Sequence, residues 1–204
     1  MGRPREFDED EVLKAAGEVF WSHGYEGTST RDLTNCTGLT PASMYNAFGD
    51  KRGLYVRSLE HYLKTILHER IARLDALGSP ARAIAGYFRE VIDRSLSDPE
   101  HRGCMLVNTA LAATPDDPEL QRLVADETAA IERFFHRQIL AGQKSGELPR
   151  QQSADDLARM LLAVVMGLRV LVRVRPDAAL LEGLARPALA MLNIPWPRGK
   201  RSAR

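Results

Sequence analysis

Hydroxyl-bearing and aromatic side chains gather in one short stretch of the chain, residues 28–51. Side chains of these types donate hydrogen bonds to phosphate oxygens and base edges, and small ones let a backbone come close to DNA. Gly38 can adopt the left-handed turn between two short helices, while Thr40 followed by Pro41 starts a helix well. This order predicts two short helices joined by a turn, which is the layout of a helix-turn-helix.

The second helix of such a unit enters the major groove with its N-terminal residues foremost. Thr40 and Ser43 can donate to phosphates or bases, and Pro41 and Ala42 offer apolar contact to a thymine methyl group. A basic arm near the N-terminus suits the narrow, negative minor groove. The predicted DNA-binding residues are Arg3, Arg5, Thr28, Ser29, Thr30, Thr40, Pro41, Ala42, Ser43, Tyr45, Asn46 and Lys51. From spacing alone, a plain helical turn in a bundle that binds no DNA stays an alternative.

Apolar spacing predicts helices along the whole chain, with no alternating strand pattern and no hairpin turn. The expected helices cover about residues 9–23, 30–36, 41–47, a long stretch from 51, 80–97, 103–113, 118–144, a stretch from 153 and 178–192. A long apolar stripe after residue 51 consists of Tyr55, Leu59, Tyr62 and Ile66. The expected fold is all-α with about nine helices. It divides into a helix-turn-helix domain (1–50), a larger helical ligand-binding and dimerisation domain (51–195) and a basic, disordered tail (196–204).

Composition restricts the function classes less than the local pattern does. The chain has 204 residues, of which 44% are hydrophobic and 27% charged, as in an ordinary soluble domain. The formal net charge is +1, and residues 1–75 hold 10 Lys and Arg against 12 Asp and Glu, so net charge gives no support for DNA binding. The polar N-terminus predicts no signal peptide, and arginines interrupt the longest apolar stretch, residues 157–174. We therefore expect a cytoplasmic protein.

From about Phe7 to Tyr62, the chain resembles the DNA-binding region of the TetR/AcrR family of bacterial transcriptional regulators. The matching residues are Ala15, Ala16, Phe20, Gly24, Tyr25, Thr28, Ser29, Thr30, Asp32, Leu33, Gly38, Leu39, Thr40, Ser43, Tyr45, Phe48, Gly49, Asp50, Lys51 and Leu54. The resemblance implies an all-helical fold of usually nine helices, three of them for DNA and the rest for ligand binding and dimerisation. It also implies that residues 40–46 lie in the major groove and that Tyr45 and Lys51 bind phosphate. Where family members often carry an aromatic residue or His, this chain has Ala47, so the operator sequence is not predicted.

Beyond residue 78 the chain has no Ser-His-Asp set, paired carboxylates, metal cluster or Gly-rich phosphate loop, so we expect no enzyme activity, metal or cofactor. The family usually binds a small, often apolar ligand between its fourth and eighth helices. The candidate lining residues are Tyr62, Ile66, Tyr87, Val91, Cys104, Met105, Asn108, Thr109, Phe134 and Met166. The apolar members can equally be core residues, whereas Asn108 and Thr109 are polar groups on an apolar helix that could orient a ligand.

The segment around Cys104 resembles a Gly-Cys-containing motif found in one branch of the family. A thiol at a helix N-terminus can have a lowered pKa and could sense oxidants or electrophiles, although a small buried core cysteine would look the same. The last two helices have broad apolar faces that suit a four-helix dimer interface.

The sequence therefore predicts a homodimeric, ligand-responsive regulator that binds double-stranded DNA, most simply a repressor released from its operator by a small molecule. One alternative is a thiol-based redox or electrophile sensor that acts on DNA through Cys104. Another is a helical small-molecule-binding protein or enzyme without a DNA function. The sequence does not predict the effector, the operator, the regulated genes or whether regulation is negative or positive.

Overall fold

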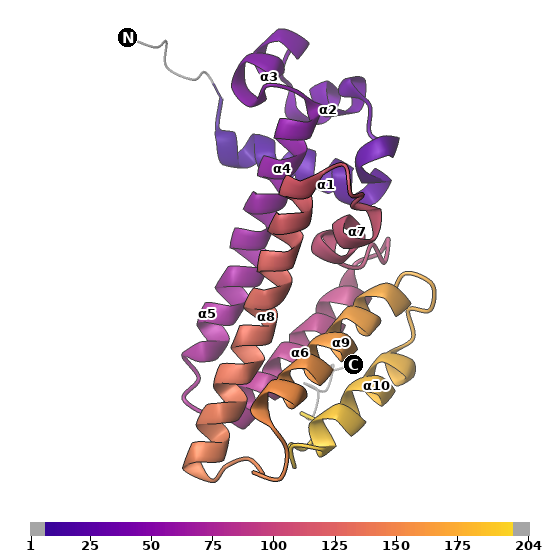
Figure 1. Cartoon of the computed structure of the whole chain (residues 1–204). Helices are drawn as coiled ribbons and strands as arrows, with labels where there is room; N and C mark the ends of the chain where they lie inside the picture. The colour runs from indigo at the N-terminus through magenta and orange to yellow at the C-terminus, as the bar shows by residue number, and fades with distance from the viewer. Residues whose placement is uncertain (1–6, 198–204) are drawn as a thin grey trace. The chain divides into compact units, whose positions relative to one another are not determined.

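A computed structural model of the chain describes residues 7–197. The predicted contacts Arg3 and Arg5, and the tail from residue 198 on, lie outside the described residues. The described part of the chain is all-α and contains no strand, as expected (Figure 1). Its helices are α1 (Glu9–Gly27), α2 (Thr30–Thr37), α3 (Pro41–Phe48), α4 (Lys51–Tyr62), the π-helical segment η1 (Leu63–His68), α5 (Glu69–Asp75), α6 (Pro80–Ser97), α7 (Met105–Ala112), α8 (Pro118–Ser145), α9 (Ala154–Leu171) and α10 (Ala178–Ala190).

Helix ends follow the capping residues of the sequence. Asp8, Ser29, Thr40 and Asp50 cap α1 to α4, and each side chain accepts a hydrogen bond from a backbone N–H of the first turn. The regular part of α1 ends at Gly24, which has φ 75° and ψ 171°, so the following residues up to Gly27 form a kinked extension. The expected end of this helix near residue 23 is therefore close to the kink.

The stretch after residue 51 differs from the regular helix that the sequence suggests. The segments α4, η1 and α5 follow one another without a break, so the described residues form nine helical rods. The π-helical turn widens the helix and shifts its register. As a result Leu63 and Leu67 are buried (1% and 5% exposed), while Ile66, a member of the predicted stripe, is only half-buried. The predicted apolar stripe assumed a constant helical period and therefore did not include this shift.

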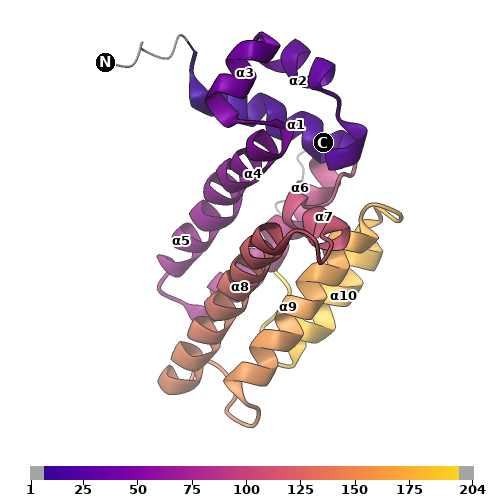
Figure 2. The ribbon, with the colours of Figure 1, turned by 45° about the horizontal axis from the view of Figure 1, so that its top comes forward.

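The described residues divide into two compact units. The first unit takes residues 7–68 and Cys104–Gln121, and the second takes Glu69–Gly103 and 122–197. The core of the first unit contains Phe20, Leu33, Met44 and Leu54, each at most 2% exposed. In the first unit α1, α2 and α3 form the cluster that contains the predicted helix-turn-helix (Figure 2).

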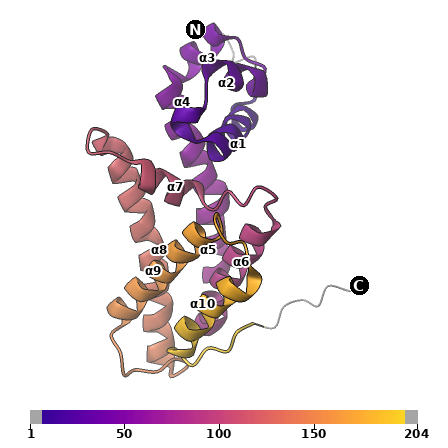
Figure 3. The ribbon, with the colours of Figure 1, turned by 90° about the vertical axis from the view of Figure 1, so that its right-hand side faces the viewer.

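An aromatic cluster forms the centre of the second unit. Tyr87 and Phe88 of α6 pack against Phe134 and Phe135 of α8, with ring centroids 5.0–5.8 Å apart. All four side chains are at most 1% exposed. The last two helices, α9 and α10, lie side by side in this unit (Figure 3). The four rings are therefore core residues of this unit and are not accessible from its surface.

Candidate nucleic-acid interface

A reciprocal capping box starts α2. The backbone N–H and the hydroxyl of Ser29 both donate to one carboxylate oxygen of Asp32, at 2.8 and 2.6 Å, and the Asp32 N–H donates back to the Ser29 hydroxyl at 3.2 Å. The hydrogen bond from the Ser29 side chain, followed by the one from the Ser29 backbone, lowers the pKa of Asp32. The helix ends at Gly38, whose left-handed backbone (φ 70°) turns the chain toward α3.

The helix α3 presents one exposed face and one buried face. Thr40 caps it by accepting from the Ser43 N–H at 3.1 Å, and Pro41 occupies the first turn, where a missing N–H costs nothing. Met44 and Phe48 are 0% and 6% exposed and hold the helix against the core. The exposed residues of this helix are Pro41, Ala42, Ser43, Tyr45 and Asn46. All five belong to the predicted DNA-binding set, so the structure brings them together on one surface.

Contacts from three elements fix the orientation of α3. The Tyr45 hydroxyl lies 3.2 Å from the Thr30 hydroxyl on α2. The Phe48 ring packs against Phe7 with 6.2 Å between centroids. Gly49 has φ 82°, which lets the chain turn directly from α3 into α4. These contacts, made by residues next to the exposed face, fix the position of that face.

Lys51, the first residue of α4, follows α3 closely in the chain, is half-buried and makes no ion pair among the described residues. Its ammonium group lies 4.4 Å from the centroid of the Tyr25 ring, a cation–π contact that holds the charge in place. The next residue, Arg52, is engaged differently. Its guanidinium donates to Asp117 at 2.6 and 2.9 Å and to Glu119 at 3.0 Å. Lys51 is therefore available to a phosphate, and Arg52 is already neutralised.

Two predicted contacts have hydroxyl groups that already donate hydrogen bonds within the protein. Thr28 is 1% exposed, and its hydroxyl donates to the carbonyl of Gly24 at 2.7 Å, so its side chain faces the protein and not the solvent. Ser29 donates its N–H and its hydroxyl hydrogen to Asp32, so neither of these two donors is free for a phosphate. The sequence pattern does not distinguish hydroxyl groups that cap a helix or lie in the core from hydroxyl groups that face the solvent.

One exposed cation beside this surface was missed. Arg31 lies in the first turn of α2, next to Thr30, and is exposed. Among the described residues no ion pair is recorded for it. It is the only Lys or Arg between residues 28 and 50, which is the signal in the sequence that could have identified it.

The predicted ligand-lining residues fall into both compact units. In the first unit lie Tyr62, Ile66, Cys104, Met105, Asn108 and Thr109, and in the second lie Tyr87, Val91, Phe134 and Met166. Thr109 is 1% exposed and its hydroxyl is shared between the Tyr55 hydroxyl and the Met105 carbonyl, both at 2.7 Å. Tyr87 and Phe134 are part of the aromatic cluster of the second unit. Burial of this kind shows core packing for these three residues.

Cys104 is half-buried and is the N-cap of α7, but its side chain makes no capping hydrogen bond. The Tyr62 hydroxyl donates to its sulfur at 3.6 Å. Both cysteines are free thiols, and Cys36 is exposed on α2. Among the described residues no cluster of three or more His, Cys, Asp or Glu side chains is arranged to hold a metal ion. In the same part of the chain, every helix is too short or too polar to cross a membrane.

The all-α fold and the exposed face of α3 define a protein of the helix-turn-helix DNA-binding class. Residues 12–57 match the family described as "Bacterial regulatory proteins, tetR family", and residues 80–187 match "Tetracyclin repressor-like, C-terminal domain". The chain belongs to the TetR family and is a transcriptional regulator. This assignment confirms the family resemblance and the all-helical fold expected from the sequence.

Relatives and solved structures agree with this assignment. The chain is 34% identical over 195 residues to the uncharacterised HTH-type transcriptional regulator YezE of Bacillus subtilis (strain 168), covering 95% of this chain and 100% of that protein. It is 30% identical over 197 residues to the HTH-type transcriptional repressor ComR of Escherichia coli (strain K12), covering 96% and 92%. A cysteine mutant of the TetR family regulator CifR, complexed with 26-bp double-strand operator DNA, matches with a TM-score of 0.82 and 34% identity over 94% of this chain and 100% of that one. The comparisons do not favour the redox alternative through Cys104.

Proposed function

We propose that the protein is a homodimeric repressor that inserts α3 into the major groove of an operator and leaves it when a small molecule binds. The observation that carries the proposal is the exposed row of Pro41, Ala42, Ser43, Tyr45 and Asn46 on a helix anchored by buried side chains. Small residues at the start of α3 let its backbone approach base edges. The Tyr45 hydroxyl and Lys51 supply phosphate contacts that set the position of the helix.

The relatives support the repressor role. ComR is named a repressor, and the CifR structure holds operator DNA on the same fold. On this proposal residues 1–50 form the DNA-binding domain, 51–195 the ligand-binding and dimerisation domain, and 196–204 a basic tail. The protein acts on DNA in the cytoplasm and catalyses no reaction.

The last two helices support a dimer. On α9, Val170 is 39% exposed, and on α10, Leu184 is 38% exposed. Met191, directly after α10, is 47% exposed. Val174, just after α9, is 72% exposed. Large apolar side chains that remain exposed on neighbouring helices are typical of a surface that is buried in an oligomer. A two-fold dimer would set two recognition helices about 34–36 Å apart, in successive major grooves.

An effector would release the operator by favouring a dimer whose two recognition helices are wrongly spaced. The required coupling is about 1–3 kcal/mol. For the effector site we propose the residues of the predicted set that lie in the first unit and keep some exposure, Tyr62, Ile66, Cys104 and Asn108. Each of these four is half-buried, as expected for the wall of a pocket and not for a closed core.

The direct test is selection of bound sequences from random double-stranded DNA by the full chain, followed by a screen for small molecules that release the selected site. We expect a palindromic site and an affinity that falls steeply with salt. Failure to select any sequence, together with no binding to the DNA upstream of its own gene, would contradict the proposal. A retained response to a small molecule without any DNA binding would favour the helical binding-protein alternative.

A further inference from the structure

The first unit contains a cavity of about 380 Å³ close to the proposed DNA-binding surface. Its walls come from the end of α1 after the Gly24 kink, the start of α4, the end of α7 and the turn into α8. These elements meet within the first unit (Figure 1). Of the residues predicted to line an effector site, only Thr109 borders this cavity. Its volume lies within the range of about 300–1,000 Å³ that is typical of small-molecule sites.

The walls of the cavity are held open by specific contacts. The Tyr55 ring lies 5.1 Å from the Tyr25 ring, and the Tyr55 hydroxyl is fixed by Thr109 at 2.7 Å. On another side, Arg52 binds both carboxylate oxygens of Asp117, and one of these oxygens also accepts the Leu120 N–H at 3.0 Å. A cavity framed in this way keeps its shape before a ligand arrives, which lowers the entropic cost of binding.

The charges on the walls restrict the class of ligand. Arg52 is neutralised by Asp117 and Glu119, so it offers no free positive charge to an anion. The remaining walls come from the two tyrosine rings, the alanine and leucine side chains, the backbone of Gly24 and Gly27, and the polar side chains of His23, Glu26, Thr109 and Thr114. The Glu26 carboxylate adds negative charge, which also disfavours an anionic ligand. No hydrogen bond is recorded within the described chain for the Tyr25 hydroxyl, which can pair with a polar group on a ligand. These walls fit a small, uncharged aromatic molecule with one hydroxyl or amide group.

The same tyrosine that borders the cavity also holds Lys51. Because the Lys51 ammonium lies 4.4 Å from the Tyr25 ring centroid, a ligand that moves Tyr25 also moves the charge beside α3. A ligand that displaces Arg52 would also displace Lys51, because the two residues are consecutive at the start of α4. We propose that this cavity is a second regulatory site, separate from the predicted effector residues, where a small uncharged aromatic molecule binds and weakens the grip on DNA. The effect on DNA rests on the proposed function, whereas binding in the cavity does not.

The test uses p-cresol as the probe and benzoate as its charged counterpart, with binding to the full chain measured by ligand-observed NMR. We expect p-cresol to bind and benzoate to bind at least about tenfold more weakly. Ala112→Phe fills the cavity from the end of α7 and should weaken p-cresol binding about tenfold or more. The matched control is Ala110→Phe, because Ala110 is exposed on the same helix and does not border the cavity. A second filling variant, Ala113→Leu, serves if Ala112→Phe does not fold.

Operator affinity is then measured by fluorescence anisotropy with and without saturating p-cresol. We expect p-cresol to lower the affinity of the unmodified chain about fivefold or more, and the effect to disappear in Ala112→Phe but not in Ala110→Phe. Undetectable p-cresol binding, or binding that both filling variants leave unchanged, would overturn the site. Binding that leaves DNA affinity unchanged would overturn the regulatory role. A chain that binds p-cresol as expected but no DNA would overturn the proposed repressor function and support the cavity site.

Discussion

The hydroxyl of Tyr45 on α3 lies 3.2 Å from the hydroxyl of Thr30 at the start of α2. This contact ties the two helices of the helix-turn-helix together at their exposed edge. Tyr45 is nevertheless 42% exposed, so on the proposed function its side chain is accessible to a phosphate of the DNA. The residue can therefore serve the orientation of α3 and the contact with DNA at once.

We expect Tyr45→Phe to lower operator affinity about two- to tenfold, because it removes one hydrogen bond to a phosphate. The loss should be similar for specific and random DNA, since phosphates carry no sequence information. Fluorescence anisotropy with specific and random double-stranded DNA measures the loss. An affinity of Tyr45→Phe equal to that of the unmodified chain would exclude the hydroxyl from the interface with DNA.

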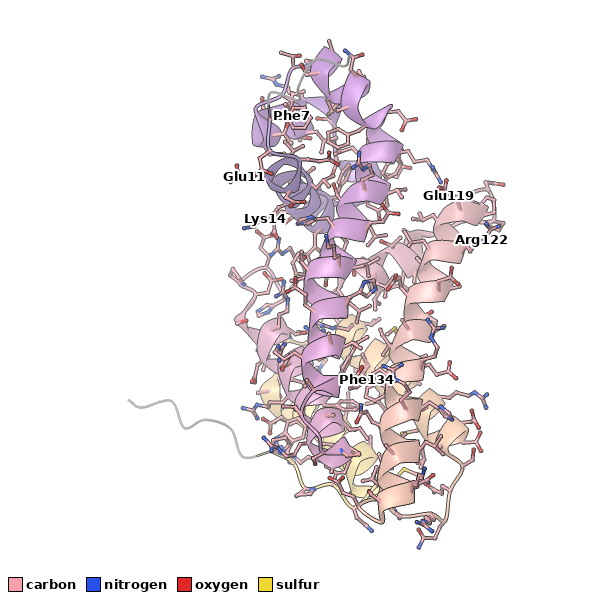
Figure 4. All side chains as sticks on the ribbon, turned by 90° about the vertical axis from the view of Figure 1, so that its left-hand side faces the viewer. Phe7, Glu11, Lys14, Glu119, Arg122 and Phe134 are labelled. Carbon is pink, nitrogen blue, oxygen red and sulfur yellow. The ribbon has the colours of Figure 1, made fainter. Side chains whose placement is uncertain are left out.

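Lys51→Ala should weaken binding to all sequences and reduce the slope of log affinity against log salt by about one. The reason is that one phosphate contact, and the counterion that it releases, is lost. Lys14→Ala provides a matched control, because Lys14 is an exposed lysine that projects from α1 and is not in the predicted DNA-binding set (Figure 4). A salt slope that is unchanged in Lys51→Ala would exclude Lys51 from the interface.

Gly53→Ala should destabilise the protein by about 1–3 kcal/mol. A Cβ atom on Gly53 would collide with the backbone carbonyl oxygen of Phe48, where α3 turns into α4, and a backbone atom cannot move aside cheaply. By contrast, a Cβ atom on Gly17 would lie 3.7 Å from Ser58, so Gly17→Ala should be neutral or stabilise α1 by up to about 1 kcal/mol. Urea unfolding of the two variants measures the difference, and equal stability would refute the packing argument.

Asp117→Asn should reduce stability at neutral pH more than at acidic pH. The hydrogen bonds from Arg52, with a further one from the Leu120 N–H, hold the pKa of Asp117 below its ordinary value. Because the folded-state pKa is lower than the unfolded one, ionised Asp117 stabilises the fold above about pH 4, and this contribution is lost as pH falls through the folded-state pKa.

We therefore expect Asp117→Asn to cost about 0.5–1 kcal/mol at pH 7, and we expect this cost to shrink as pH falls below about 4. Urea unfolding across this range checks the pattern. Asp116→Asn is the control, since Asp116 is the adjacent exposed carboxylate and should show little effect at either pH. A deficit of Asp117→Asn that stays constant as pH falls below about 4 would point to packing and not to charge.

Val170→Glu combined with Leu184→Glu should convert the proposed dimer into monomers, because each introduces a charge on the exposed apolar surface of α9 and α10. Analytical ultracentrifugation measures the change. Leu140→Glu is the comparison, since Leu140 is 53% exposed on α8, outside these two helices. If the double variant stays dimeric while folding normally, the interface lies elsewhere.

The order of the helices and the face of α3 could be predicted because their signals are local. Ser29 and Asp32 are three residues apart, Gly38 needs only its own backbone freedom, and Thr40 with Pro41 starts a helix by itself. The π-helical turn at Leu63–His68 could not be predicted in this way, because it shifts the register of a stripe that the sequence presents as regular.

The amino-acid sequence by itself determined the helical class, the family resemblance and the exposed residues of the recognition helix, since capping and apolar spacing act over three or four residues. Only the tertiary structure decided that Thr28 is buried and that Arg52 pairs with Asp117, 65 residues away. It also decided that Tyr55 reaches Thr109, 54 residues away, and so frames the cavity beside Lys51. Contacts of this kind depend on how distant helices pack, and no spacing within one helix encodes them.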